Sequence, residues 1–197
     1  VGSEMCIRDS HYQRDQIVMH ADLLGDSYLL SKLASESDAK FVIFCGVHFM
    51  AGSADILTGD HQSVILPNLR AGCSMADMAV LEDVQSAWDS ILQLTDLRDP
   101  MDREDANKIV DDDQSFLVPI TYMNSSAELK SFVGKHGGIV CTSSNAEGVI
   151  NWALERAGPN GKLLFFPDQH LGRNTGLKLG LKEPEMLSLI HISEPTR

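Results

Sequence analysis

The feature that most constrains this fold is a series of short apolar runs, each followed by residues with helical spacing. These runs cover residues 40–45 and 63–66 and begin again at Phe116, Gly138 and Leu163. Short continuous apolar runs are typical of strands that are buried on both faces of a parallel sheet. The alternation of such strands with helices therefore predicts an α/β protein built from small parallel sheets.

The order of these elements also repeats along the chain. Strand 116–121 and a helix at 125–132 follow the same pattern as His11-Tyr12 and the helical residues after them. We further match strand 138–141 with strand 40–45, and strand 163–168 with strand 63–66. The repeat predicts two β-α-β-α-β units, each a small parallel sheet with helices on its faces.

A polar and acidic segment separates the two repeats. It covers residues 74–115 and includes the acidic run 111–113, which we interpret as a solvated turn. Residues 15–35 are predicted to form two helices separated by a break at Gly25-Asp26-Ser27. The predicted organisation is a first α/β domain at 11–80, a connecting or inserted segment at 81–115 and a second α/β domain at 116–186.

The composition excludes several classes of partner. The 197-residue chain has 16 Lys and Arg against 28 Asp and Glu, a net charge of -12, which disfavours binding to nucleic acids or anionic membranes. Its apolar runs are too short to cross a bilayer and no secretory signal precedes them, so we expect a cytoplasmic protein. Its four cysteines lack paired spacing, which favours reduced thiols or metal ligands over disulfides.

The two ends of the chain resemble sequencing-adapter sequence rather than natural protein. Residues 5–10 can be encoded by DNA whose reverse complement encodes residues 187–191. Ends that encode each other in this way are similar to a transposase adapter read at both sides of a DNA fragment. We therefore predict that residues 1–10 and 187–197 are adapter-derived tails, and we exclude them from functional argument.

Polar and nucleophilic residues follow the predicted strands, where ligands of parallel α/β sheets bind. Cys73 follows a buried strand and a proline turn, at a helix start that lowers a thiol pKa and suits nucleophilic or metal-binding roles. The alternative for a lone cysteine is an inert buried thiol. His48 opens a helix and is either a substrate-binding or proton-carrying group, or a capping or core histidine.

Two further helix starts carry polar residues. Tyr122 and Asn124 follow a strand two residues apart, and Asn124 or Ser125 is expected to cap the next helix. Thr142 to Asn145 place hydroxyls and backbone N–H groups at another helix start, which favours an anion. No GxGxxG, Walker or GxSxG motif is present, which disfavours dinucleotide oxidoreductases and serine hydrolases.

Taken in order, these segments resemble the quinolinate synthase family. The resemblance covers nearly all of residues 11–186 and rests on seven motifs: His-Tyr-Gln-Arg-Asp at 11–15, Gly-Asp-Ser at 25–27, Gly-Val-His-Phe-Met-Ala at 46–51, Ala-Gly-Cys-Ser-Met-Ala-Asp at 71–77, Thr-Tyr-Met-Asn-Ser-Ser-Ala-Glu at 121–128, Cys-Thr-Ser-Ser-Asn-Ala at 141–146 and Pro-Asp-Gln-His-Leu-Gly at 167–172. Each motif is weak alone, but their ordered combination is specific.

The resemblance implies an enzyme of three similar α/β domains around a pseudo-threefold axis, two of which this chain would supply. The family, a transferase of NAD biosynthesis, condenses iminoaspartate with dihydroxyacetone phosphate to quinolinate. L-aspartate oxidase is the implied source of iminoaspartate. The implied cofactor is a 4Fe-4S cluster held by three cysteines, whose open iron acts as a Lewis acid.

The resemblance also implies roles for individual residues of this chain. Cys73 matches a cluster ligand, whereas Cys45 and Cys141 do not. Tyr12 and Tyr122 match catalytic positions, with Tyr12 a candidate for proton transfer. The positions expected to bind substrate are Asp26, Ser27, His48, Tyr122, Asn124 and Ser143.

The chain also departs from the family pattern. Ser10 stands where the family has a histidine, and the chain ends before the other two cluster cysteines. We therefore expect a longer parent protein to be the quinolinate synthase, and this chain to be inactive. The alternative is a metal-free α/β module that binds a phosphorylated or dicarboxylate metabolite; an unstable fragment without function is a third possibility.

Overall fold

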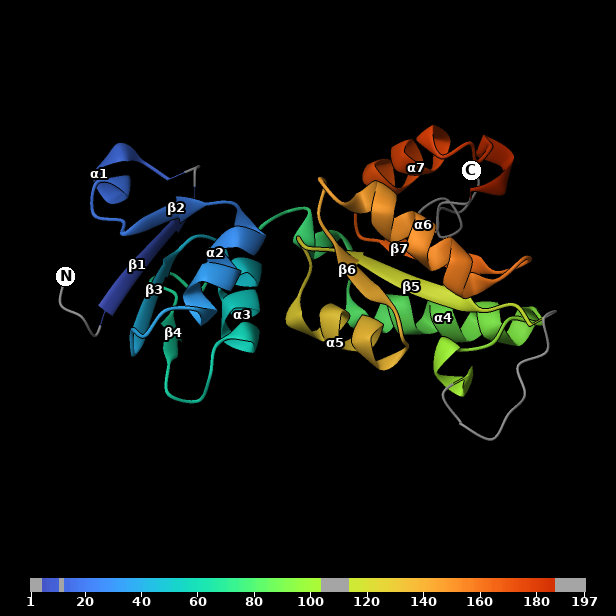
Figure 1. Ribbon diagram of the computed structural model, residues 1–197, viewed down its shortest axis with the longest axis horizontal. Coiled ribbons are helices and arrows are strands. Elements are labelled where there is room, and N and C mark those ends of the chain that lie inside the picture. The colour runs from blue at the N-terminus through green and yellow to red at the C-terminus, as the bar shows by residue number, and fades with distance from the viewer. Residues whose placement is uncertain (1–4, 11–12, 104–113, 187–197) are drawn as a thin grey trace, which may run out of the picture. The chain divides into compact units, whose positions relative to one another are not determined.

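The chain forms two compact units (Figure 1). The computed structural model describes residues 5–10, 13–103 and 114–186; Tyr12, the acidic run 111–113 and the tail 187–197 lie outside these residues. The first unit comprises the residues up to Asp77 together with Met123–Ala127, and the second comprises Met78–Tyr122 and the residues from Glu128 onward. Each unit alternates strands and helices around a parallel sheet, which confirms the predicted fold class.

The first unit contains a four-stranded parallel sheet in the order β2-β1-β3-β4. Its elements are β1 (Met5–Ser10), α1 (Asp15–Val18), β2 (Leu23–Gly25), α2 (Ser27–Ser35), β3 (Phe41–Cys45), α3 (His48–Leu57), β4 (Ser63–Ile65) and the 3-10 turn η1 (Ala76–Met78). Val42 and Phe44 alternate along β3 and pack with Leu30 of α2 and Ala54 of α3 in one apolar core. Burial of these side chains is the main stabilising contribution of this layer.

The prediction of two helices over residues 15–35 is wrong in its first half. Only α1, a single turn without buried residues, precedes a strand, β2, that pairs with β1. Three residues of β2 satisfy their backbone groups in the sheet, and this pairing overrides the helical spacing of their leucines. Asp26 then caps α2, because its carboxylate accepts a hydrogen bond from the Leu29 N–H at 2.9 Å.

The second unit contains a three-stranded parallel sheet in the order β6-β5-β7. Its elements are α4 (Leu81–Leu94), the 3-10 turn η2 (Pro100–Arg103), β5 (Leu117–Tyr122), α5 (Ala127–Lys135), β6 (Ile139–Cys141), α6 (Ala146–Ala157), β7 (Lys162–Phe166), α7 (Gln169–Lys178) and the 3-10 turn η3 (Glu183–Glu185). The predicted strands and helices of this half are present, in the predicted β-α-β-α-β order.

Two cores cover the two faces of this sheet. On one face, Leu117 packs with Trp88 of α4 and Phe132 of α5. On the other face, Val118 and Ile120 pack against α6. The central strand β5 is therefore buried on both sides, which explains why its sequence is continuously apolar.

The polar segment 74–115 contains a helix that belongs to the second unit. Helix α4 buries Val84 and Trp88, and the Trp88 ring meets the Phe132 ring edge-on at a centroid distance of 5.6 Å. Only one face of α4 is apolar, so its polar residues dominate the local composition and hide the helix from a reading by composition. Part of the segment that we predicted as a connection therefore packs into the core of the second unit.

The internal repeat is shifted by one strand from the predicted match. In each unit the first strand is central, the second lies on one side and the third on the other. By this order β1, β2 and β3 correspond to β5, β6 and β7, and β4 is an addition to the first unit. Gly25-Asp26-Ser27 therefore corresponds to Cys141-Thr142-Ser143, and His48 corresponds to the start of α7.

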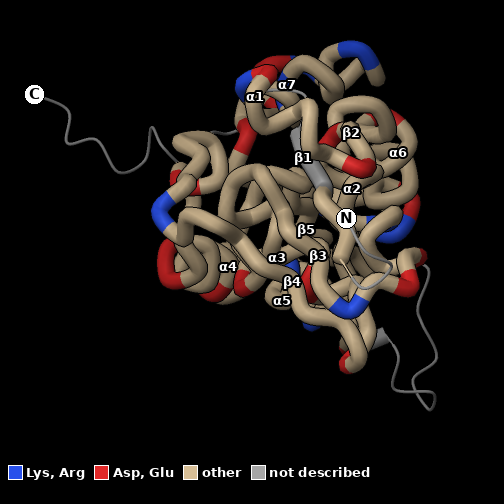
Figure 2. Tube along the Cα trace, turned by 90° about the vertical axis from the view of Figure 1, so that its left-hand side faces the viewer, with Lys and Arg blue, Asp and Glu red and all other residues tan. Residues whose placement is uncertain are grey.

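The acidic character of the chain is distributed over many elements. Asp and Glu residues occur in many separate segments of the Cα trace (Figure 2). Among the described residues, no helix is both long enough and apolar enough to cross a membrane.

Burial of Lys130 makes the stability of the second unit depend on pH. Desolvation lowers the pKa of this α5 ammonium from 10.5 to about 8. Between these values the unfolded chain binds more protons than the folded chain, so stability rises as the pH rises through this range. We expect Lys130→Met to lose that rise, and chemical unfolding across the range measures it.

Lys135→Met on the exposed surface of the same helix is the matched control and should retain the rise. Comparing each variant with the unmodified chain cancels the contribution of Cys141. That thiol has its pKa raised to about 12, so it acts in the opposite direction above pH 9. An unchanged rise in the Lys130→Met variant would contradict the assignment.

Candidate active site

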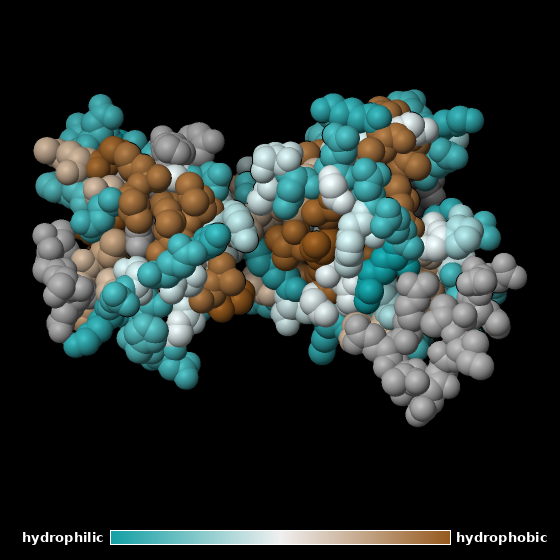
Figure 3. Space-filling model, in the orientation of Figure 1, coloured by the Kyte–Doolittle hydropathy of each residue, from teal (hydrophilic) through white to brown (hydrophobic). Residues whose placement is uncertain are grey.

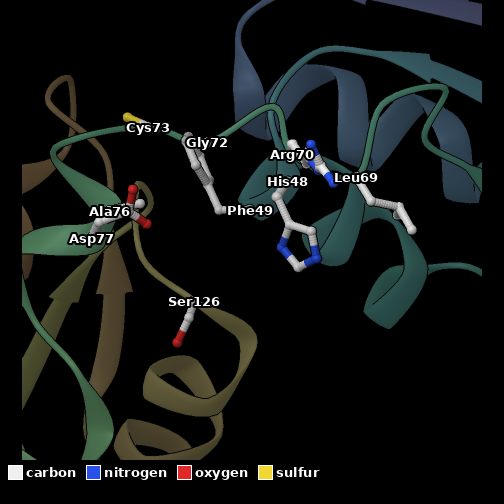
Figure 4. A pocket seen from close by; sticks show the side chains of 9 residues that line it. All are labelled: His48, Phe49, Leu69, Arg70, Gly72, Cys73, Ala76, Asp77 and Ser126. Carbon is white, nitrogen blue, oxygen red and sulfur yellow. The ribbon is translucent and has the colours of Figure 1, made fainter.

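The site is a pocket of about 210 Å³ in the first unit (Figure 4). It lies beside the start of α3, and the loop after β4 forms much of its wall. The side chains that carry chemistry in this lining are His48, Arg70, Cys73, Asp77 and Ser126. The pocket thus combines a thiol, two side chains that can carry positive charge, one carboxylate and one hydroxyl.

Backbone hydrogen bonds hold the loop against the helix. The His48 N–H at the start of α3 donates to the Ala71 carbonyl at 2.7 Å. Within the loop, the Asp77 N–H donates to the Cys73 carbonyl at 3.0 Å. These bonds fix the positions of His48 and Cys73, so two residues predicted from separate motifs line one pocket.

The thiol of Cys73 is half-buried and packs against the core of the first unit. Its sulfur atom points away from the imidazole of His48 (Figure 4). The two groups therefore do not form a nucleophile and base pair of the kind found in cysteine hydrolases. A half-buried thiol at the edge of a pocket remains accessible to a ligand or a metal.

The segment Met123–Ala127 contributes two more residues to this unit. The Asn124 side-chain amide lies 3.8 Å from the Met75 sulfur, and Ser126 lines the pocket itself. Asn124, predicted to bind substrate, therefore lies next to the Cys73 loop. Asp77 and Ser126, like Arg70, were missed by the sequence argument; their closeness to Cys73 and Asn124 in the chain was the available signal.

Asp26 and Ser27 occupy the start of α2. The Asp26 carboxylate caps the helix, and the Ser27 carbonyl accepts a hydrogen bond from the Ser31 hydroxyl at 2.8 Å. Neither residue is part of the pocket lining. Asp26 therefore has a structural role of its own, whether or not it also contacts substrate.

The other predicted residues lie in the second unit. Tyr122 is the last residue of β5 and is half-buried. Ser143 is exposed in the turn before α6, where Asn145 accepts hydrogen bonds from the Thr142 N–H at 2.7 Å and the Thr142 hydroxyl at 3.1 Å. Because these bonds hold the turn without Ser143, its hydroxyl has no structural task among the described residues.

The cysteine and acidic residues of the chain do not complete a metal site by themselves. Among the residues that the structure describes, no group of three or more His, Cys, Asp or Glu side chains could hold a metal ion. Cys141 is buried at the end of β6, and burial, with a smaller contribution from the Asp168 charge, raises its pKa to about 12. A thiol that stays protonated is a poor metal ligand, so Cys73 remains the better candidate.

A family model for quinolinate synthetase A protein matches residues 3–190. The chain belongs to this family. It is 52% identical over 187 residues to the quinolinate synthase of Corynebacterium glutamicum, covering 94% of this chain and 42% of the relative. It is 50% identical over 186 residues to that of Nocardioides sp. (92% and 43%), and 48% identical over 187 residues to that of Acidobacterium capsulatum (95% and 45%).

This quinolinate synthase family chain therefore spans less than half the length of the relatives it matches. The matched residues include most of the segment 1–10, which also contributes the central strand β1 to the first unit. The adapter origin of the two ends remains a prediction, as do the predicted domain boundaries.

Proposed function

We propose that this chain is part of a longer parent protein that condenses iminoaspartate with dihydroxyacetone phosphate to quinolinate, with release of phosphate and water. The observation that carries this proposal is the family match over residues 3–190, at about half identity to quinolinate synthases. The motifs that support it, from 46–51 and 71–77, meet in the pocket that contains His48 and Cys73.

In the parent protein, Cys73 is proposed to supply one of three thiolate ligands of a 4Fe-4S cluster. The described residues of this chain do not fit the whole cluster, because Cys73 is a single thiol without further ligands around it. We therefore place the other two cysteines outside this chain. When bound, the cluster would supply a Lewis acid.

The remaining proposed roles concern groups of this chain. His48 lines the pocket, where its imidazole can hold a substrate carboxylate or carry a proton. Tyr12 and Tyr122 are proposed to take part in proton transfer. Asn124 and Ser143 are proposed to hydrogen-bond substrate, Ser143 as an anion-binding hydroxyl at a helix start.

Asp26 and Ser27 are also proposed to bind substrate, which a pair of variants of the parent protein can separate from helix capping. Asp26→Asn keeps a good cap, whereas Asp26→Ala loses it and about 1 kcal/mol of stability. We expect both variants to bind substrate more weakly, and only the alanine variant to unfold earlier. Steady-state KM and thermal unfolding measure the two effects. An unchanged KM in Asp26→Asn would show that Asp26 is only a cap.

The parent protein is further proposed to act in the cytoplasm as a transferase of NAD biosynthesis, with L-aspartate oxidase supplying iminoaspartate. The test compares anaerobically prepared parent protein with the 197-residue chain in an assay for quinolinate. We expect product from the parent protein and none from the chain above a reaction without protein. Product from the chain alone would overturn the proposed inactivity.

A second candidate is a metal-free module that binds a phosphorylated or dicarboxylate metabolite. The observation that favours it is the pocket lining, in which His48 and Arg70 can contact an anion without any metal. Calorimetric titration of this chain with dihydroxyacetone phosphate, in the presence of a chelator, distinguishes the two. Tight binding together with an inactive parent protein would favour the module.

A further inference from the structure

One face of the sheet in the first unit carries a continuous set of apolar side chains. The parallel register pairs Ile7 of β1 with Ile43 of β3, and Ile43 with Ile65 of β4. Residues paired in this way point to the same face of a sheet, and Met5 and Phe41 lie two residues earlier on that face. This open face, defined here as Met5, Ile7, Phe41, Ile43 and Ile65, crosses three neighbouring strands.

The opposite face carries the core of the unit, and the open face lacks a comparable cover. Helices α2 and α3 both lie on the side of Val42 and Phe44 (Figure 1). Phe41 is 43% exposed and Ile65 is 42% exposed, and α1 buries none of its residues. Apolar side chains are also visible at the surface of this unit in the space-filling view (Figure 3).

The second unit shows what covers the equivalent face. There, α6 lies on one face of the sheet, whereas α4 and α5 together cover the other. Because β1, β2 and β3 correspond to β5, β6 and β7, α1 and α2 take the places of α5 and α6. The first unit therefore retains its counterpart of α6, reduces its counterpart of α5 to one turn, and has none of α4 among the described residues.

Helix α4 precedes the central strand β5, so its counterpart would precede β1. We propose that the open face binds an amphipathic helix from the part of the parent protein that precedes β1. Its expected pattern is that of α4, in which Val84 and Trp88, four residues apart, are buried against the sheet. The relatives are more than twice as long as the segment they share with this chain, which leaves room for such a helix.

The test adds the proposed cover to this chain. The 197-residue chain is compared with the same chain preceded by the residues that come before the matched segment in the Corynebacterium glutamicum relative. The extension is expected to remove most of the fluorescence of a dye that binds exposed apolar surface, and to slow hydrogen exchange in β3. Neither readout depends on enzymatic activity, so the proposed function and this proposal can fail separately.

Two variants locate the effect on the open face. Phe41→Lys on this face should abolish the protection given by the extension, whereas Ile56→Lys, at an exposed apolar position of α3, should leave it intact. Circular dichroism checks that both variants fold. An extension that changes neither dye binding nor exchange would overturn the proposal. So would a dimer of the unextended chain that Phe41→Lys dissociates, because the occupant would then be a second copy.

Discussion

Replacing Gly138 with alanine is expected to abolish cooperative folding of the second unit. A Cβ atom at this position would lie 2.0 Å from the Pro119 carbonyl oxygen and 2.9 Å from a methyl carbon of Val133. Pro119 belongs to the central strand β5, so its backbone cannot move without disturbing both neighbouring strands. We expect a cost of about 3 kcal/mol or more, measured by chemical unfolding.

Gly148→Ala is the matched control for this prediction. Gly148 lies within α6, and a Cβ atom there would meet nothing within 4 Å. Alanine is a better helix former than glycine, so this variant should gain about 0.5–1 kcal/mol. If both glycine variants had the same stability, the close approach of Gly138 to β5 would be wrong.

Replacing Cys73 with alanine in the parent protein is expected to abolish quinolinate formation. The proposed role of Cys73 is that of a thiolate ligand, and a methyl group cannot replace a ligand of an iron–sulfur cluster. The iron content of the protein should fall with the activity, because the cluster would be held by two thiolates at most. Both quantities are measured on anaerobically purified protein, with circular dichroism as the check on folding.

Cys45→Ala is the matched control, since Cys45 is also half-buried in the first unit but lies within β3. It should leave both iron content and quinolinate formation close to those of the unmodified parent protein. A Cys73→Ala protein that retained its iron and its activity would remove Cys73 from the cluster.

Much of the fold could be predicted from local sequence pattern. Strands such as β3 and β5 are short, apolar and bounded by turn residues, and their burial on the sheet follows from these properties. Strand β2 could not be predicted, because its three residues are fixed by pairing with β1 rather than by their own pattern. Helix α4 was obscured for a different reason, since only its buried face with Val84 and Trp88 is apolar.

The candidate site was predictable in part. The motifs containing His48 and Cys73 were identified from sequence, and the fold brings both residues to one pocket through the hydrogen bond from His48 to Ala71. Arg70 could not be singled out, because an arginine in a polar loop has no periodic or compositional signature. Its place in the lining depends on how the loop folds back on α3, which is a tertiary property.

The measurement that tests the central proposal most directly is the sequence of the source DNA outward from residues 11 and 186. We expect the reading frame to continue in both directions without the two tails, and to encode two further cysteines after the Pro-Asp-Gln-His-Leu-Gly motif at 167–172. Those cysteines would complete the ligand set to which Cys73 is assigned. A reading frame that keeps the tails as genomic sequence and has no further cysteines would contradict the assignment and favour the metal-free module.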